Sequence, residues 1–284
     1  MMIDALLEDL KPISGATVRA GEVLARHTPL RVGGPAEIWA SVDDLEALSA
    51  VLSASRRHKV PWRICWPLGD WLVRDGGVRG LVVRLGVGFE GVRVEDGLVW
   101  LGAAALWSQL GGRPMTEALD AVSRFPGSVG GLLSEGDAGQ LGGLVRRIRL
   151  LRGRRIEEIT LEPGEDLPVI PGTAVILEVA LATEQTHIKG RRKPRLPEPP
   201  PPAALFNATD ELPVAAMLAR AGVGNARLRS WRLSATGTVI QLGGGTCKDV
   251  LLLASGLADR VQRERGVELK TRLSVVGVDL AATA

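Results

Sequence analysis

The chain has 284 residues, of which 45% are hydrophobic and 24% charged, which is typical of a globular protein rather than of a disordered one. A formal net charge of +3 does not require a nucleic-acid partner, because the densest basic segment, 189–195, lacks aromatic residues that stack on bases. Two distant cysteines and three histidines show neither a disulfide framework nor metal-ligand spacing. Without a signal-peptide pattern or a run of about 18 apolar residues, we expect a cytoplasmic protein with no membrane span.

The first part of the chain carries signals for one helix and several strands. Ser41 is the expected N-cap of a helix that runs to about Lys59, with apolar residues at helical spacing from Leu45 onward. Alternating runs at 92–95 and 98–101 flank Asp96-Gly97, which predicts a hairpin because both turn residues must accept a positive φ. A second hairpin and two further strands are expected at 145–151 with 154–159, at 81–85 and at 175–181.

A change in composition at 187–202 predicts a linker. Basic residues there give way to the run Pro197-Glu198-Pro199-Pro200-Pro201-Pro202, which favours an extended polyproline II segment. We therefore expect one domain at 1–186, with two lobes of about 1–85 and 86–186, and a second at 203–284.

The C-terminal part contains two expected helices and a closing strand. The first helix spans 212–221 and ends at Gly222. Thr246-Cys247-Lys248-Asp249 resembles a capping box, which would begin a helix that ends at Gly266 and has Val250, Leu253, Leu257 and Val261 on one face. A strand at 273–277 follows. Helices and hairpins mixed in this way predict an α+β protein.

Two glycine-rich segments are candidates for a binding site. Gly33-Gly34-Pro35 follows Leu30-Arg31-Val32, and a second segment reads Gly127-Ser128-Val129-Gly130-Gly131. Glycine permits a positive φ or a close backbone approach, and exposed amides bind anions. Taken alone, each segment is more often a structural turn than a phosphate cradle.

In their order along the chain, these segments resemble the UDP-N-acetylenolpyruvoylglucosamine reductase (MurB) family. The similarity covers roughly residues 3 to 277 and is carried by segments 24–37, 72–80, 125–131, 221–223 and 249–269. The resemblance implies a two-part FAD-binding domain of the vanillyl-alcohol-oxidase (PCMH) type, followed by a smaller α+β substrate domain. It also implies a reaction of peptidoglycan precursor synthesis, in which NADPH reduces FAD and the flavin passes hydride to an enolpyruvyl UDP-sugar. The implied FAD contacts are Arg31, Gly33, Gly34, Gly69, Asp70, Gly127, Ser128 and Gly130.

The chain departs from the family at its third glycine-rich loop, which binds pyrophosphate and reads Gly-x-Gly-Ser-Asn in the family. The matching segment here begins Trp66-Pro67-Leu68 and continues through Gly69 and Asp70. Pro67 removes an amide donor, and the side chains of Trp66 and Leu68 block close approach by a phosphate. Asp70 adds a like charge whose contact with a diphosphate costs on the order of a few kcal/mol.

Three catalytic positions of the family also differ. Ala204 stands at the position of the proton-donating serine, and Arg272 stands at that of a C-terminal carboxylate. The segment that carries a substrate-polarising arginine is absent between 166–172 and the strand near Val175, and the chain has no tyrosine.

Two functions from different classes follow. One is a MurB homologue without reductase activity that has a binding or scaffolding role. The alternative is an active FAD- and NADPH-dependent reductase that uses other residues. Expected partners are a UDP-sugar, with Lys193 as a candidate phosphate ligand or an ordinary linker lysine, and cell-wall synthesis proteins. Trp66, Trp71 and Trp107 either fill the flavin pocket or are ordinary core aromatics.

Overall fold

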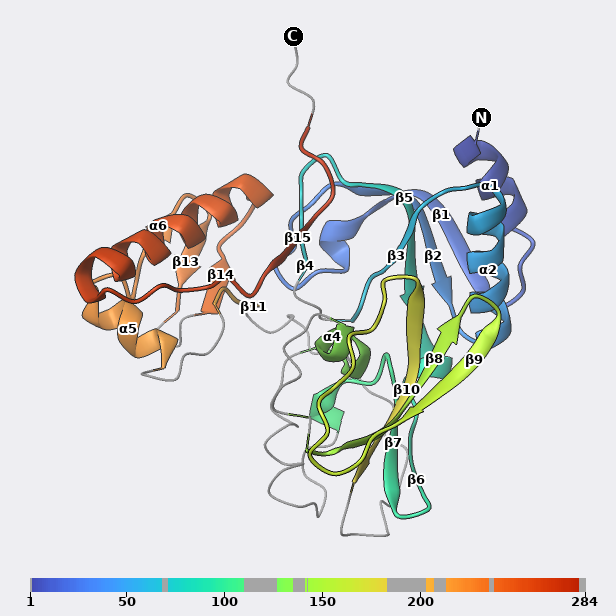
Figure 1. The fold of residues 1–284 in the computed structure, drawn as a ribbon. Helices are drawn as coiled ribbons and strands as arrows, with labels where there is room; N and C mark the ends of the chain where they lie inside the picture. The colour runs from blue at the N-terminus through green and yellow to red at the C-terminus, as the bar shows by residue number, and fades with distance from the viewer. Residues whose placement is uncertain are drawn as a thin grey trace. The chain divides into compact units, whose positions relative to one another are not determined.

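The chain divides into two compact units (Figure 1). A computed structural model describes residues 2–67, 71–109, 127–134, 141, 143–182, 203–206, 213–234 and 238–280. The first unit comprises Met1–Glu22, Glu37–Gly69 and Gly80–Leu196, and the second comprises Val23–Ala36, Asp70–Arg79 and Pro197–Ala284. The expected linker at 187–202 lies outside the described residues, so the expected domain bounds of 1–186 and 203–284 stay a prediction.

The first unit contains a four-stranded sheet with two helices packed against it. The sheet has the order β1-β2-β5-β3, with β1 at Ala16–Val23, β2 at Pro35–Val42, β5 at Val78–Leu85 and β3 at Trp62–Ile64. Helices α1 (Met2–Leu10) and α2 (Leu45–Arg57) share its apolar core, because α1 buries Leu6 and Leu10 and α2 buries Leu48, Val51 and Leu52.

The predicted start of helix α2 was wrong by several residues. Ser41 is not its N-cap, because strand β2 continues through Val42. The N-cap is Asp44, whose carboxylate accepts a hydrogen bond from the amide of Ala47 at 2.7 Å. A cap must follow the end of the preceding strand, and that end is determined by pairing with β5 and β1 rather than by local sequence.

A five-stranded antiparallel sheet completes the core of the first unit. Its order is β6-β7-β10-β8-β9, with β6 at Val92–Glu95, β7 at Leu98–Gly102, β10 at Ala174–Ala182, β8 at Val145–Arg152 and β9 at Arg155–Thr160. Asp96 and Gly97 have φ values of 52° and 72°, which confirms the first predicted hairpin. The second hairpin is confirmed by the pairing of β8 with β9. Short helices of this unit lie at η2 (Val87–Phe89), η3 (Trp107–Gln109) and α4 (Val129–Ser134), while η1 (Leu24–Arg26) belongs to the second unit.

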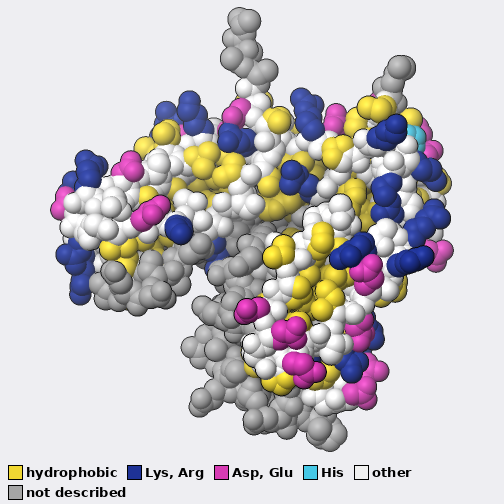
Figure 2. All heavy atoms as spheres, viewed as in Figure 1, with side chains coloured by type: hydrophobic (Ala, Val, Ile, Leu, Met, Phe, Trp, Pro, Cys, Tyr) yellow, Lys and Arg dark blue, Asp and Glu magenta, His cyan; other side chains and the backbone are white. Residues whose placement is uncertain are grey.

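Arginine and glutamate side chains pair across this sheet. The buried ring of Trp100 is contacted by two arginines, because the guanidinium carbons of Arg149 and Arg93 lie 4.4 and 4.9 Å from its centroid. Both arginines donate hydrogen bonds to Glu178, and Arg149 also donates to Glu158. On the face that Figure 2 shows, basic and acidic side chains are interspersed in the same way rather than gathered by sign.

The second unit has its own core, built on two small sheets and two helices. Strand β4 (Trp71–Val73) pairs in parallel with β15 (Ser274–Val276). A four-stranded sheet has the order β11-β14-β13-β12, with β11 at Ala203–Ala204, β14 at Thr238–Gln241, β13 at Trp231–Leu233 and β12 at Arg227–Leu228. The helices are α5 (Val214–Arg220) and α6 (Cys247–Arg265).

Helix α6 confirms the predicted capping box. The hydroxyl of Thr246 accepts from the amide of Asp249 at 3.1 Å, and the Asp249 carboxylate accepts from the amide of Thr246 at 3.3 Å. Gly266 ends the helix in the left-handed region with a φ of 71°. The four predicted apolar positions are all buried, namely Val250, Leu253, Leu257 and Val261.

Candidate functional site

The glycine pair at 33–34 packs against the chain itself. A β-carbon at Gly34 would lie under 3.0 Å from three backbone atoms, two in Asp75 and one in Gly77. A β-carbon at Gly33, whose φ is +116°, would lie equally close to three atoms of Val73. The amide of Gly34 donates to the carbonyl of Arg74 at 3.0 Å. These glycines therefore let the segment lie directly on strand β4 and the turn that follows it.

Gly77 adds to this contact, whereas Arg31 lies beside it. Gly77 faces Pro35 from the other side, with three Pro35 backbone atoms under 3.0 Å from a β-carbon built on it. Arg31 has a positive φ of 52°, an exposed side chain, and an amide that donates to the carbonyl of Thr28. Of the implied FAD contacts in this segment, Arg31 is the one whose side chain is exposed to solvent.

The segment from Gly127 to Gly131 leads into helix α4, and its amides from Val129 onward are used internally. Ser128 is fully buried and caps the helix with its hydroxyl. A phosphate cradle needs amides that point at the ligand, and here successive amides already have protein acceptors. The pairs are Val129 with the Ala105 carbonyl at 2.9 Å, Gly130 with the Ala103 carbonyl at 2.8 Å, Gly131 with the Ser128 hydroxyl at 3.3 Å and Leu132 with the Ser128 carbonyl at 3.1 Å.

The side chain of Trp66 lies on this glycine segment. A β-carbon at Gly130 would come under 3.0 Å from three atoms of the Trp66 ring. At Gly131 it would lie 3.1 Å from the β-carbon of Trp66. Trp66 is 7% exposed, and both glycines are buried. Two segments that the resemblance assigns to flavin binding thus pack on each other through an indole ring.

Other predicted residues fall outside this arrangement or outside the described residues. Leu68, Gly69 and Asp70, which complete the third loop, are among the residues that the structure does not describe, and so is Lys193. Of the other two tryptophans expected near the flavin region, Trp107 is fully buried in the first unit and Trp71 is buried in the second. The roles assigned to all of these residues stay predictions.

Ala204 and Arg272, to which the resemblance assigns a proton donor and a carboxylate, lie near each other in the second unit. The amide of Arg272 donates to the carbonyl of Leu205 at 2.8 Å, directly after Ala204 at the end of β11. An isolated bridge pairs Phe206 with Thr271. Main-chain contacts of the two residues that follow Ala204 therefore bring position 204 close to Arg272.

Cys247, at the first turn of α6, is a chemically distinctive residue that the sequence did not single out for reactivity. It is buried, and its amide donates to the carboxylate of Asp75 at 3.0 Å. Burial raises the pKa of the Cys247 thiol from 9.0 to about 11, and the negative charge of Asp75 acts in the same direction.

We therefore expect Cys247 to be unreactive in the folded protein. At pH 8 a thiol with this pKa is only ~0.1% thiolate, the form that reacts. Because the folded pKa lies above the unfolded one, this thiol stabilises the fold fully below pH 9 and loses that effect as pH rises toward 11. In a Cys65→Ser variant, an aromatic disulfide reagent should label the remaining thiol only after urea is added. Equal labelling rates with and without urea would contradict this.

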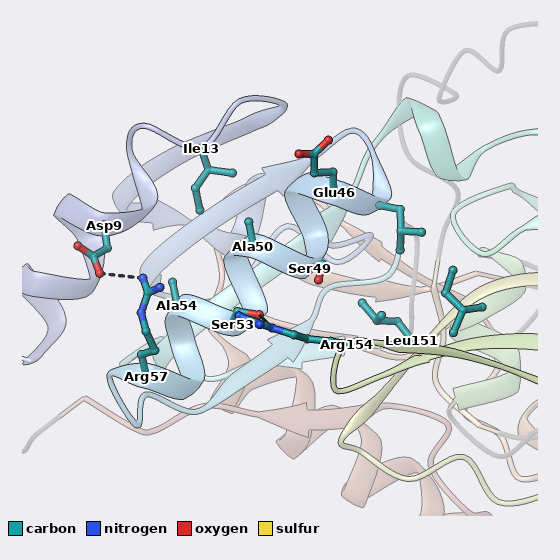
Figure 3. A pocket seen from close by; sticks show the side chains of 12 residues that line it. Asp9, Ile13, Glu46, Ser49, Ala50, Ser53, Ala54, Arg57, Leu151 and Arg154 are labelled. Carbon is teal, nitrogen blue, oxygen red and sulfur yellow. Dashed lines mark hydrogen bonds and ion pairs between the residues drawn. The ribbon is translucent and has the colours of Figure 1, made fainter.

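A surface groove of about 740 Å³ lies elsewhere in the first unit, between α2 and the β8–β9 hairpin (Figure 3). Arg57 there pairs with Asp9 at 3.0 Å, and Arg154 donates to the hydroxyl of Ser53 at 3.4 Å. The apolar part of its lining includes Ile13, Leu45 and Leu151. None of the implied site residues lines this groove, and no sequence motif indicates it.

Within the described ranges, no helix is long and apolar enough to cross a membrane, and no group of His, Cys, Asp or Glu side chains is arranged to hold a metal.

Comparison with known proteins gives consistent matches over nearly the whole chain, although no family model matches it. The UDP-N-acetylenolpyruvoylglucosamine reductase of Anoxybacillus flavithermus is 25% identical over 301 residues, which cover 97% of this chain and 99% of the relative. The enzyme of that name from Alkaliphilus oremlandii is 27% identical over 292 residues, covering 94% and 96%. Among solved structures, UDP-N-acetylenolpyruvylglucosamine reductase (MurB) from Thermus caldophilus matches with a TM-score of 0.65 and 20% identity, covering 92% of this chain and 98% of that one.

These matches extend over both units of the chain. The structural match, with mixed helices and sheets in both units, confirms the predicted α+β fold class. Near-complete coverage of both chains means that the similarity is not confined to one motif or one unit. Over nearly its whole length the chain is therefore similar, at 25–27% identity to the relatives named above, to the UDP-N-acetylenolpyruvoylglucosamine reductases of the MurB family.

Proposed function

We propose that this chain is a MurB homologue that does not catalyse the reductase reaction and that serves peptidoglycan precursor synthesis by binding. The observation that carries the proposal is the pair of neighbouring positions Ala204 and Arg272, joined through the main-chain contact between Leu205 and Arg272. By resemblance to the family, these positions belong to a serine that donates a proton and to a carboxylate.

The residues present cannot perform the steps that those positions serve. The reaction implied by the family needs a hydride acceptor held against the flavin, stabilisation of an enolate and a proton for it. An alanine methyl group has no proton to transfer. A guanidinium group is the conjugate acid of a very strong base, so an arginine does not serve as a proton donor in place of the serine. Replacing a carboxylate by a guanidinium also reverses the charge at that position.

The alternative, an active reductase, is favoured by the similarity that spans the whole chain. It requires other residues of this chain to supply the proton and to bind FAD and NADPH. Since function depends on sites rather than on folds, we give the altered positions more weight.

The deciding experiment is a steady-state assay of the purified full chain with added FAD, NADPH and the enolpyruvyl derivative of UDP-N-acetylglucosamine. We expect no substrate-dependent NADPH oxidation, while the Alkaliphilus oremlandii relative, assayed in parallel, is the positive control. Substrate-dependent oxidation that is lost on heat treatment of the protein would sink the proposal.

The binding role has its own test. Calorimetry with UDP-N-acetylglucosamine asks whether the ligand is a UDP-sugar, and Lys193→Ala tests whether that lysine contacts the diphosphate. A saturable heat that weakens in Lys193→Ala supports a UDP-sugar ligand. With no heat at high ligand concentration, the UDP-sugar is excluded and a cell-wall synthesis protein is the partner left to test.

A further inference from the structure

Gly130 and Gly131 form the glycine face of helix α4, and the side chain of Trp66 covers it. Five of the six residues of α4 are buried, including Gly130 and Gly131. Glycine is required at 130 because any β-carbon there would collide with the ring of Trp66. In a cofactor cradle such a glycine would leave room for a ligand, whereas here it leaves room for an indole.

Four amides of helix α4 are bonded within the protein and are not available to a phosphate. Four successive amides, from Val129 to Leu132, donate to acceptors within the first unit. An anion that recruited them would first have to break these bonds and leave buried carbonyls at Ala103 and Ala105 without partners. The residues present therefore do not fit a flavin diphosphate on this face.

The ring of Trp66 joins the two sheets of the first unit. Trp66 follows strand β3 of the four-stranded sheet, where the amide of the adjacent Cys65 donates to the carbonyl of Val83 at 2.8 Å. Helix α4 is held by the chain after strand β7 of the five-stranded sheet, through Ala103 and Ala105. Contact between Trp66 and Gly130 thus adds an apolar link between elements that belong to different sheets.

We infer that the indole of Trp66 takes the place of a cofactor on the glycine face of α4, so that the first unit folds without FAD. This deepens the proposed function, because it gives a structural reason for the absence of flavin chemistry. The two can fail separately. A protein that binds FAD without turnover would overturn the inference alone, and turnover would overturn the proposed function.

The first test is flavin uptake by the full chain. Purified wild-type protein is titrated with FAD while flavin fluorescence and the melting temperature are followed. A ligand that binds only the folded state raises the melting temperature by mass action. We expect no saturable change in either signal. Flavin that co-purifies in stoichiometric amount, or a saturable rise in melting temperature, overturns the inference.

The second test asks whether the ring itself supports the fold. Trp66→Gly should lower the melting temperature by on the order of 10 °C, because it empties a buried site the size of an indole. Free indole should restore part of that loss in Trp66→Gly and none in Trp62→Gly, a control on strand β3 whose ring is only half-buried. Indole that stabilises both variants equally, or neither, contradicts the inference.

A second pair of variants, with a smaller change in side-chain size, is used if Trp66→Gly does not fold. Trp66→Leu keeps an apolar side chain but fills less of the space above Gly130, so we expect a smaller loss of melting temperature that still exceeds the loss in Trp62→Leu. Equal losses in these two variants would show that position 66 has no special role.

Discussion

Gly34→Ala is expected to lower the free energy of unfolding by at least about 3 kcal/mol, because the new methyl group collides with main-chain atoms rather than with a movable side chain. Its β-carbon would lie under 3.0 Å from atoms of Asp75 and Gly77, which belong to the turn after strand β4. To relieve the clash, that turn or the segment before β2 has to move. Urea unfolding, followed by tryptophan fluorescence, measures the loss.

A matched control replaces another glycine of the same unit, and this substitution is expected to raise the free energy of unfolding rather than lower it. Gly256 lies in the middle of helix α6, is exposed, and has no atom within 4 Å of a β-carbon built on it. Gly256→Ala should therefore stabilise the protein by up to about 1 kcal/mol through helix propensity. If Gly34→Ala does not lower the free energy of unfolding relative to the wild type, as we expect for Gly256→Ala, then Gly34 is not needed for the fold. In that case a ligand-binding role would again be the better explanation for the glycine.

The second prediction concerns the coupling between Trp66 and Gly130. Gly130→Ala places a methyl group against the indole ring and is expected to cost about 2–4 kcal/mol, while Trp66→Ala empties the space and costs about 3–5 kcal/mol. In the double variant, the methyl at 130 occupies part of the space that the ring has left. The double variant should therefore be more stable than the sum of the two losses predicts, by about 1–3 kcal/mol.

This coupling is measured as a double-mutant cycle by urea unfolding. The control cycle pairs Trp66→Ala with Gly143→Ala, since a β-carbon at Gly143 has no neighbouring atom within 4 Å. Losses in the control pair should add to within about 0.5 kcal/mol. Losses that add equally well for Trp66 with Gly130 would mean that the ring does not press on the glycine in solution.

The sequence alone determined those features whose cause is local. A hairpin at Asp96-Gly97 follows from two adjacent residues that accept a positive φ, and the start of α6 follows from a hydroxyl and a carboxylate three residues apart at Thr246 and Asp249. The family resemblance, carried by collinear segments, also led to the correct α+β fold class. The turn and cap signals each lie within a few residues. The family resemblance depends only on the order of segments along the chain.

Tertiary structure decided what depends on distant partners. The N-cap of α2 is Asp44 rather than Ser41 because sheet pairing extends β2 through Val42. Sequence left two interpretations open for Trp66, as a filler of the flavin pocket or as an ordinary core residue. Its contact with Gly130, 64 positions away, makes it a buried part of the glycine segment, since only folding brings β3 and α4 together.

The same reason applies to the candidate site. Ala204 and Arg272 were matched to family positions from the sequence, yet their proximity depends on contacts of the residues just after β11 with the segment before β15. Whether a glycine segment binds a phosphate or packs on its own chain is likewise decided by which acceptors its amides find. In this protein the amides of 129–132 find acceptors within the first unit, and the sequence of the segment contains no sign of it.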